Sequence, residues 1–253
     1  MIFELNKRKR KMKRKAIFAT ALCLSLMVAG CSSGSDDKES KESEAKSSAA
    51  ATEESTEGST EAPAPTHEVT VDTVVVMAYS DGVYDYTSVV PNLIVDGQEA
   101  GDINAEISNY IREKYPMTIE DDFVDGYTTS LEWGTTGNTV SIVIYASDIY
   151  SDYFTCEVFN FDLDTLTAID DSEVAKRLGY GEDEFLGKAA EVIRAYCEGK
   201  DFDLDKCVSS VSFDTLTPFI TSEGGAAVAA TLYFAPDSQF SGSESVRVFN
   251  LSE

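Results

Sequence analysis

The side chains most able to do chemistry in this chain are carboxylates, and three of them alternate in the segment DFDLDKC. Asp201, Asp203 and Asp205 have the spacing of the first ligands of an EF-hand calcium loop. That loop also needs glycine at its sixth position and glutamate at its twelfth, where this chain has Lys206 and Ser212. The segment therefore does not predict a calcium site, and we assign no metal-ligating residue.

A single histidine, His67, limits the remaining chemistry. One histidine argues against a Ser-His-Asp triad, a Cys-His dyad and a zinc site built from several histidines. The sequence also lacks a P-loop and a GxGxxG motif. A carboxylate pair of the glycosidase type stays open, but residues 67–253 hold 35 acidic residues and none of them stands out. We assign no catalytic residue and no cofactor-binding residue.

The most specific chemical motif surrounds Cys31, in the segment MVAGCSSG. Residues 7–15 carry eight basic side chains, and residues 16–29 carry no charge, which is the pattern of an export signal. Val-Ala-Gly-Cys then resembles the bacterial lipobox, in which the cysteine thiol receives a diacylglycerol group and the signal is cleaved just before it. We therefore expect a signal peptide at 1–30, cleavage between Gly30 and Cys31, and lipidation of Cys31. The alternative is an ordinary secretory signal with an incidental cysteine.

The segment 31–66 follows this cysteine and contains no Val, Ile, Leu or aromatic residue. Such a composition cannot bury enough apolar surface to offset the entropy of ordering, so we expect a disordered acidic tether. Without residues 1–30 the chain has 12 basic and 44 acidic residues, a net charge of −32. This charge excludes nucleic acid as a partner and would attract a cationic protein or a divalent metal, or it serves solubility alone.

Three further cysteines lie in the remaining domain, 67–253, and their odd number excludes a complete disulfide framework. Cys156 lies in FTCEVF, where the alternation predicts a small hydrophobic residue of a buried strand. Cys197 and Cys207 lie ten residues apart, and whether they pair in an oxidising compartment stays open.

The elements that must position these residues follow from the periodicity of the domain. Apolar residues at helical spacing predict helices at 102–115, 171–179 and 182–199. Val-rich and alternating segments predict strands at 68–80, 84–97 (with Pro91 as a break or an edge), 127–133, 138–148, 153–163, 217–224, 226–235 and 244–251. Strands clustered apart from helices predict an α+β domain, an antiparallel sheet with two to three helices packed on one face.

The order of these features resembles a known family. The phrases are VVPNLIVDGQEAGDINAEISNYI (89–111), VFNFDLDTLTAI (158–169), the helix at 182–198 and the closing strands at 217–251. They are similar to the C-terminal α+β domain of unknown function of the lysozyme-binding anti-sigma factor of Gram-positive bacteria, a domain also found beside peptidoglycan deacetylases. One difference is the segment at 147–158, where the family often carries Gly-Gly-Ala-His. Neither deacetylase activity nor sigma-factor binding is implied for this chain.

Together these features favour a membrane-anchored lipoprotein on the outer face of the cytoplasmic membrane or cell surface of a Gram-positive bacterium. Its domain would bind a protein or envelope ligand, with a cationic protein such as lysozyme or a cell-wall component as partner. The alternative is a carboxylate-dependent enzyme that acts on carbohydrate or the cell wall, and a third reading is a structural envelope protein. We expect a non-enzymatic role over an enzymatic one.

Overall fold

The computed structural model describes residues 66–121, 123–151 and 153–251, all within one compact unit, Thr56–Glu253. The expected α+β class is confirmed, because antiparallel strands make up 47% and helices 23% of the described residues. Four helices are present in the described part: α1 (Gly101–Lys114), α2 (Asp171–Arg177), α3 (Glu182–Cys197) and α4 (Leu204–Ser209). The strands divide among three hydrogen-bonded sheets.

The first sheet holds β1 (Val69–Ser80), β2 (Asp85–Val95) and β3 (Gln98–Glu99). The central sheet has the order β4-β5-β6-β7-β8, with bounds Met117–Glu120, Phe123–Thr136, Thr139–Asp148, Phe154–Asp162 and Thr167–Ala168. The C-terminal sheet has the order β11-β10-β9, with bounds Glu244–Asn250, Ala226–Tyr233 and Leu216–Ile220. All of these pairings are antiparallel, and consecutive strands are neighbours in each sheet.

The central sheet is buried on both faces, and strand β6 shows why. Its even-numbered residues, such as Ile142 and Ile144, pack with α1 in one core. Its odd-numbered Val143 packs with Phe219 and the alanines of the C-terminal sheet in another. Successive side chains of a strand point to opposite faces, so an uninterrupted apolar strand must lie between two layers.

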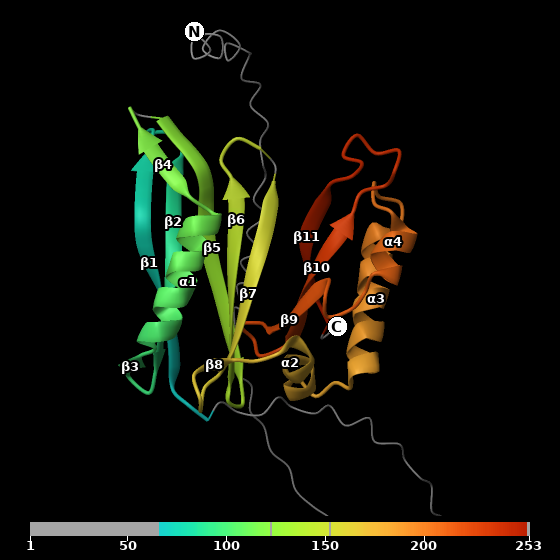
Figure 1. The fold of residues 1–253 in the computed structure, drawn as a ribbon, viewed down its shortest axis with the longest axis horizontal. Coiled ribbons are helices and arrows are strands. Elements are labelled where there is room, and N and C mark those ends of the chain that lie inside the picture. The colour runs from blue at the N-terminus through green and yellow to red at the C-terminus, as the bar shows by residue number, and fades with distance from the viewer. Residues whose placement is uncertain (1–65, 122, 152, 252–253) are drawn as a thin grey trace, which may run out of the picture. The chain divides into compact units, whose positions relative to one another are not determined.

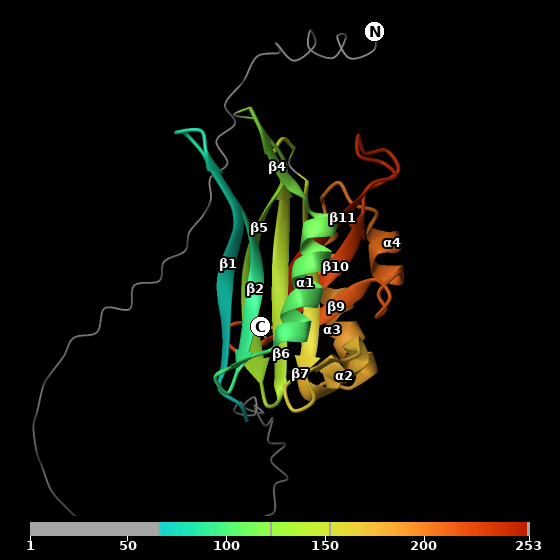
Figure 2. The ribbon, with the colours of Figure 1, turned by 60° about the vertical axis from the view of Figure 1, so that its left-hand side comes forward.

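The C-terminal sheet is likewise buried on both faces of β10, but with smaller residues. In β10, Ala227 and Ala229 face the central sheet, whereas Val228 and Leu232 face α3. The layers therefore run α1, central sheet, C-terminal sheet and then α2 to α4 (Figure 1). The second view shows α1 across the front of the central strands, away from the other three helices (Figure 2).

On the side that faces away from β1, strand β2 pairs only with β3 at Ile94 and Val95, so its remainder is an edge in the described domain, as Pro91 predicts, and it is not broken at Pro91. Pro91 pairs with Thr73 of β1. On either side of it, the backbone amides of Val89 and Leu93 donate to side chains and not to the backbone of another strand. Val89 N donates to Thr129 Oγ1 at 2.6 Å, and Leu93 N donates to Asn104 Oδ1 at 2.7 Å. At this position no neighbouring strand among the described residues would accept a hydrogen bond from a backbone amide. Proline fits here because it has no amide hydrogen.

The three expected helices are present with ends shifted by one or two residues, as is usual for assigned boundaries. Helix α4 was not expected, because its first turn lies in the Asp-rich segment read above for calcium chemistry. Asp203 is its N-cap and accepts a hydrogen bond from Lys206 N at 3.0 Å. Aspartate is both a common calcium ligand and a preferred N-cap residue, so the local sequence does not distinguish the two roles.

Candidate functional site

The residues singled out for chemistry are dispersed in the structure. Gly30 and Cys31 lie outside the described residues, so cleavage and lipidation stay predictions. Asp203 caps α4, and Asp201 accepts a hydrogen bond from Ser238 Oγ at 2.5 Å, so these two carboxylates have structural partners. Among the described residues, no group of three His, Cys, Asp or Glu side chains could hold a metal ion.

His67 forms a clasp with two aspartates at the start of the described chain. Its Nδ1 lies 2.7 Å from Asp96 Oδ2, and its Nε2 lies 2.9 Å from Asp164 Oδ1. Carboxylates only accept hydrogen bonds when ionised, so this geometry is complete when both ring nitrogens carry a proton. The hydrogen bonds that His67 donates to Asp96 and then to Asp164 accordingly raise the pKa of His67 above its ordinary value of 6.5.

The three domain cysteines are buried free thiols. Tyr233 N donates to Cys207 Sγ at 3.2 Å, and Cys197 lies in the same core. Burial, with the nearby Cys207, raises the pKa of Cys197 to about 12, and burial raises the pKa of Cys156 to about 12. The thiolate is the nucleophile, so Cys156 and Cys197 are poor nucleophiles at neutral pH.

The most exposed aromatic residues gather on four hairpin turns, which we call the hairpin surface. The turns join β1 to β2, β4 to β5, β6 to β7 and β10 to β11, and all four point toward the same end of the described domain (Figure 1). The five aromatic side chains are between 43% and 62% exposed: Tyr84, Phe123, Tyr150, Tyr153 and Phe240. Isolated exposed apolar residues are ordinary, but aromatic residues at every turn of one end make this end the candidate interaction surface of the described domain.

The turns are formed by local hydrogen bonds that leave these rings outside. Asp81 Oδ1 accepts from Val83 N at 2.8 Å and from Tyr84 N at 2.7 Å, and Gly82 between them has a φ of +84°. In the neighbouring turns the rings of Phe123 and Tyr150 stack with centroids 5.5 Å apart. Turn hydrogen bonds and contacts between rings thus position these side chains.

The hairpin surface is also acidic. None of the four turn segments, 80–86, 117–126, 147–154 and 234–244, contains a lysine or an arginine. The exposed acidic residues described in them are Asp81, Asp85, Glu120, Asp121, Asp125, Asp237 and Glu244. Aromatic rings provide desolvated contact area, and the carboxylates favour a cationic partner.

The chain enters the domain at the end opposite the hairpin surface. Thr66 N donates to Gly137 O, in the β5–β6 turn, at 3.0 Å, and His67 is fixed by Asp96 and Asp164 beside it. Strand β1 starts there at Val69 and reaches the hairpin surface at Ser80. A tether that precedes residue 66 would therefore attach on the far side of the domain from the aromatic turns.

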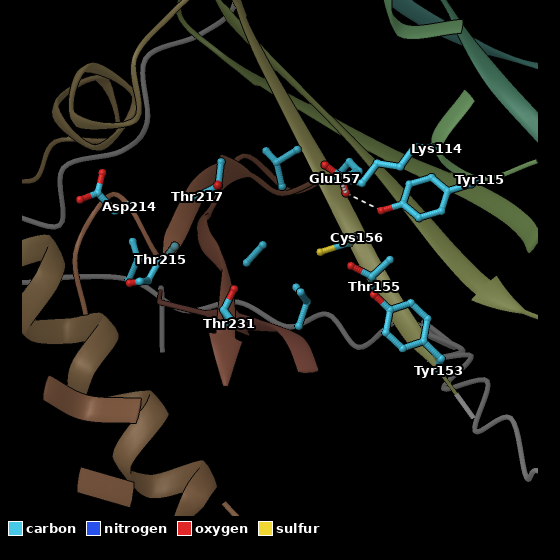
Figure 3. A pocket seen from close by; sticks show the side chains of 14 residues that line it. Lys114, Tyr115, Tyr153, Thr155, Cys156, Glu157, Asp214, Thr215, Thr217 and Thr231 are labelled. Carbon is cyan, nitrogen blue, oxygen red and sulfur yellow. Dashed lines mark hydrogen bonds and ion pairs between the residues drawn. The ribbon is translucent and has the colours of Figure 1, made fainter. Parts of the chain in front are cut away.

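A cleft of about 320 Å³ lies beside β7, between the central and C-terminal sheets (Figure 3). Its most connected side chain is Glu157. Lys114 Nζ donates to Glu157 Oε1 at 2.7 Å, Tyr115 OH donates to the same oxygen, and Tyr110 OH donates to Oε2 at 2.9 Å. The carboxylate is thus paired with Lys114 and accepts three hydrogen bonds on the α1 side of the cleft.

The rest of the cleft is uncharged except for one carboxylate. Cys156, Val158, Ala229 and Val246 give it an apolar floor, and threonine hydroxyls line its walls, as the close view shows for Thr217 and Thr231. Asp214 stands across from Glu157, is exposed and forms no ion pair with a described residue. Burial and then the hydrogen bond to Glu157 raise the pKa of Tyr115, so its hydroxyl acts as a donor.

Sequence reasoning missed this cleft because its residues come from five separate segments. Tyr115 and Glu157 are 42 residues apart, and Asp214 follows another helix. Trp133 is half-buried and lines a different groove of about 490 Å³ with Val71 and Thr73. No local spacing signals either assembly, because only the strand crossings bring the residues together.

Comparisons with protein-family models, with curated proteins and with solved structures found no match for this chain. The family resemblance described from the sequence therefore stays a prediction. Within the described residues, no helix has the length and apolar composition needed to cross a bilayer.

Proposed function

We propose that this protein is a lipid-anchored extracytoplasmic binding protein whose hairpin surface binds a cationic protein. The observation that carries the proposal is the hairpin surface itself: exposed aromatic rings and acidic residues, without a basic residue, at the end of the domain away from residue 66. Lipidation at Cys31 and the acidic tether would hold that end away from the membrane.

The chemistry of the surface indicates how the partner would be recognised. Aromatic side chains at an interface core supply most of the binding energy, whereas surrounding charges mainly accelerate association and select the partner. A small basic envelope or host protein such as lysozyme fits these requirements. The enzymatic alternative has less support, because Glu157 is held by three donors and the three described thiols are buried, with raised pKa values for Cys156 and Cys197.

A direct titration with lysozyme tests this proposal, preceded by capture of proteins from host secretions at physiological salt. Tyr84→Ser and Phe240→Ser should each raise the dissociation constant by about tenfold, the effect of losing one interface anchor. Leu166→Asn is the matched control: Leu166 is 41% exposed but lies in the β7–β8 turn, where its φ of +52° suits asparagine.

Salt separates specific docking from simple charge attraction. Raising the ionic strength should slow association, because the acidic residues steer the partner, yet leave binding that still depends on Tyr84. Binding that vanishes with salt and ignores both aromatic substitutions would leave only nonspecific attraction. Failure of lysozyme and of every secreted basic protein to bind would overturn the proposal.

A further inference from the structure

Strand β7 has a free outer edge beside the cleft. On one side it pairs with β6 from Phe154 to Asp162, but on the other β8 covers only Phe161 and Asp162. Among the described residues, no strand pairs with the outer side of Phe154–Phe159. An open edge presents unpaired backbone donors and acceptors, which proteins ordinarily cover or block.

The outward backbone groups of this edge belong to Cys156 and Val158. Asn160 O points outward, since it accepts a hydrogen bond from Ile169 N at 3.1 Å on the β8 side. In an antiparallel pair, alternate residues direct their N–H and C=O away from a given neighbour. Cys156 and Val158 share this phase with Asn160, and both line the cleft.

The cleft extends over both faces of β7, which is the space that an added strand requires. Glu157 contacts Lys114 and Tyr115 at the end of α1, on one face. Cys156 and Val158 pack on the other face with residues of the C-terminal sheet. A strand laid beside β7 would direct alternate side chains toward the Glu157 cluster and toward the apolar floor (Figure 3).

The charges of the cleft indicate which residue types the added strand should carry. Glu157 is already paired with Lys114, whereas Asp214 on the opposite wall has no described ion-pair partner. A basic residue of the incoming segment would complete the pairing, and small aliphatic residues would suit Ala229 and Val246. An acidic segment would be repelled, because Asp214 has no cation to shield it.

The geometry points to β-strand addition: an extended segment of a basic protein partner pairs with β7 at Cys156 and Val158, inside the cleft. This inference rests on the proposed function, since it describes a second contact by which the cationic partner bound at the hairpin surface would be held. Tyr153 belongs to both surfaces, so one partner could occupy them together. Main-chain hydrogen bonds would provide affinity, and the cleft would select alternate side chains.

The variant Val158→Pro tests the pairing itself. Proline removes only an amide that β6 does not use, and Pro91 shows that this fold accepts proline on the unpaired side of a strand. The probe is a blocked heptapeptide of alternating lysine and valine, followed by NMR of the protein's amides. We expect peptide binding to protect the amides of Cys156 and Val158 from exchange, and Val158→Pro to raise the dissociation constant about tenfold.

Two further variants keep the inference testable if Val158→Pro does not fold. Thr231→Tyr should fill the cleft and abolish peptide binding, and Asp214→Asn should weaken it about threefold. Tyr84→Ser, on the hairpin surface, should leave peptide binding unchanged. No change at the amides of Cys156 and Val158 with the peptide in millimolar excess would overturn strand addition. If lysozyme still bound wild type and Val158→Pro equally, the proposed function would stand and strand addition would fall.

Discussion

Ser141 of β6 and Asn160 of β7 are paired in the central sheet and share one buried hydrogen bond, from Ser141 Oγ to Asn160 Oδ1 at 2.6 Å. Each residue also reaches β9: Ile220 N donates to Ser141 Oγ at 2.9 Å, and Asn160 Nδ2 donates to Pro218 O at 2.9 Å. These contacts lie between layers that otherwise meet through small apolar side chains. Polar partners have directional geometry, so this network fixes where β9 crosses β6 and β7.

Asn160→Leu should lower the free energy of unfolding by about 2–3 kcal/mol, because it leaves buried polar groups of Ser141 and Pro218 without partners. Urea unfolding followed by circular dichroism measures the change. The control is Ser130→Ala, since Ser130 is an exposed residue of neighbouring β5. Ser141→Ala combined with Asn160→Leu should cost less than the two single changes together, and strict additivity would argue against one shared network.

Two glycines predict opposite effects of the same substitution. A Cβ at Gly134 would lie 1.9 Å from Thr221 O, whereas a Cβ at Gly187 in α3 meets nothing within 4 Å. Gly134→Ala should destabilise the protein by about 3 kcal/mol through forced backbone displacement. Gly187→Ala should stabilise it by about 0.5–1 kcal/mol, because glycine costs that much in a helix interior. Equal melting temperatures for the two variants would contradict this close approach.

His67 predicts a pH dependence whose sign follows from its two partners. Because the folded pKa is raised, the contribution of the clasp is full below about pH 6.5 and is lost as pH rises through the folded pKa. The pKa values of Asp96 and Asp164 are lowered, so their contribution is present above about pH 4 and is lost as pH falls. The clasp should therefore contribute most in the weakly acidic range between these limits.

NMR measures this directly, since the chain has one histidine and its ring signal is unambiguous. The midpoint should lie above 6.5 and should fall in Asp96→Asn, whereas Asp102→Asn, on exposed α1 surface, should not move it. The difference in melting temperature between wild type and His67→Gln should shrink as pH rises above neutrality. An unshifted midpoint would mean that the clasp is not formed in solution.

Cys31→Ser tests the predicted membrane anchor. The variant should lose incorporation of a radiolabelled lipid precursor and leave the membrane fraction, because a protein needs its acyl chains for stable attachment when no other anchor is present. Cys23→Ser is the matched control, since Cys23 lies within the apolar part of the predicted signal. Retention of Cys31→Ser in the membrane without label would show that the cysteine is incidental.

The local elements were predictable because their causes are local. Ile103, Ile107 and Ile111 at helical spacing predicted α1, and all three are buried against the central sheet. The alternation of β10 predicted a strand, and Pro91 predicted an edge that the structure confirms on one side of β2. The prediction failed where local signals compete, as at α4, where Asp203, in a segment typical of cation ligation, serves as the N-cap.

The sequence by itself determined the class of fold, the strong acidity and the expectation of an anchored domain, because composition and periodicity carry these properties. Only the tertiary structure decided that four separate turns share one end, and that Glu157 meets Lys114 and Tyr115 beside an open strand edge. These relationships depend on how strands from distant segments pair and on how the two sheets stack. Spacing along the chain does not encode that geometry.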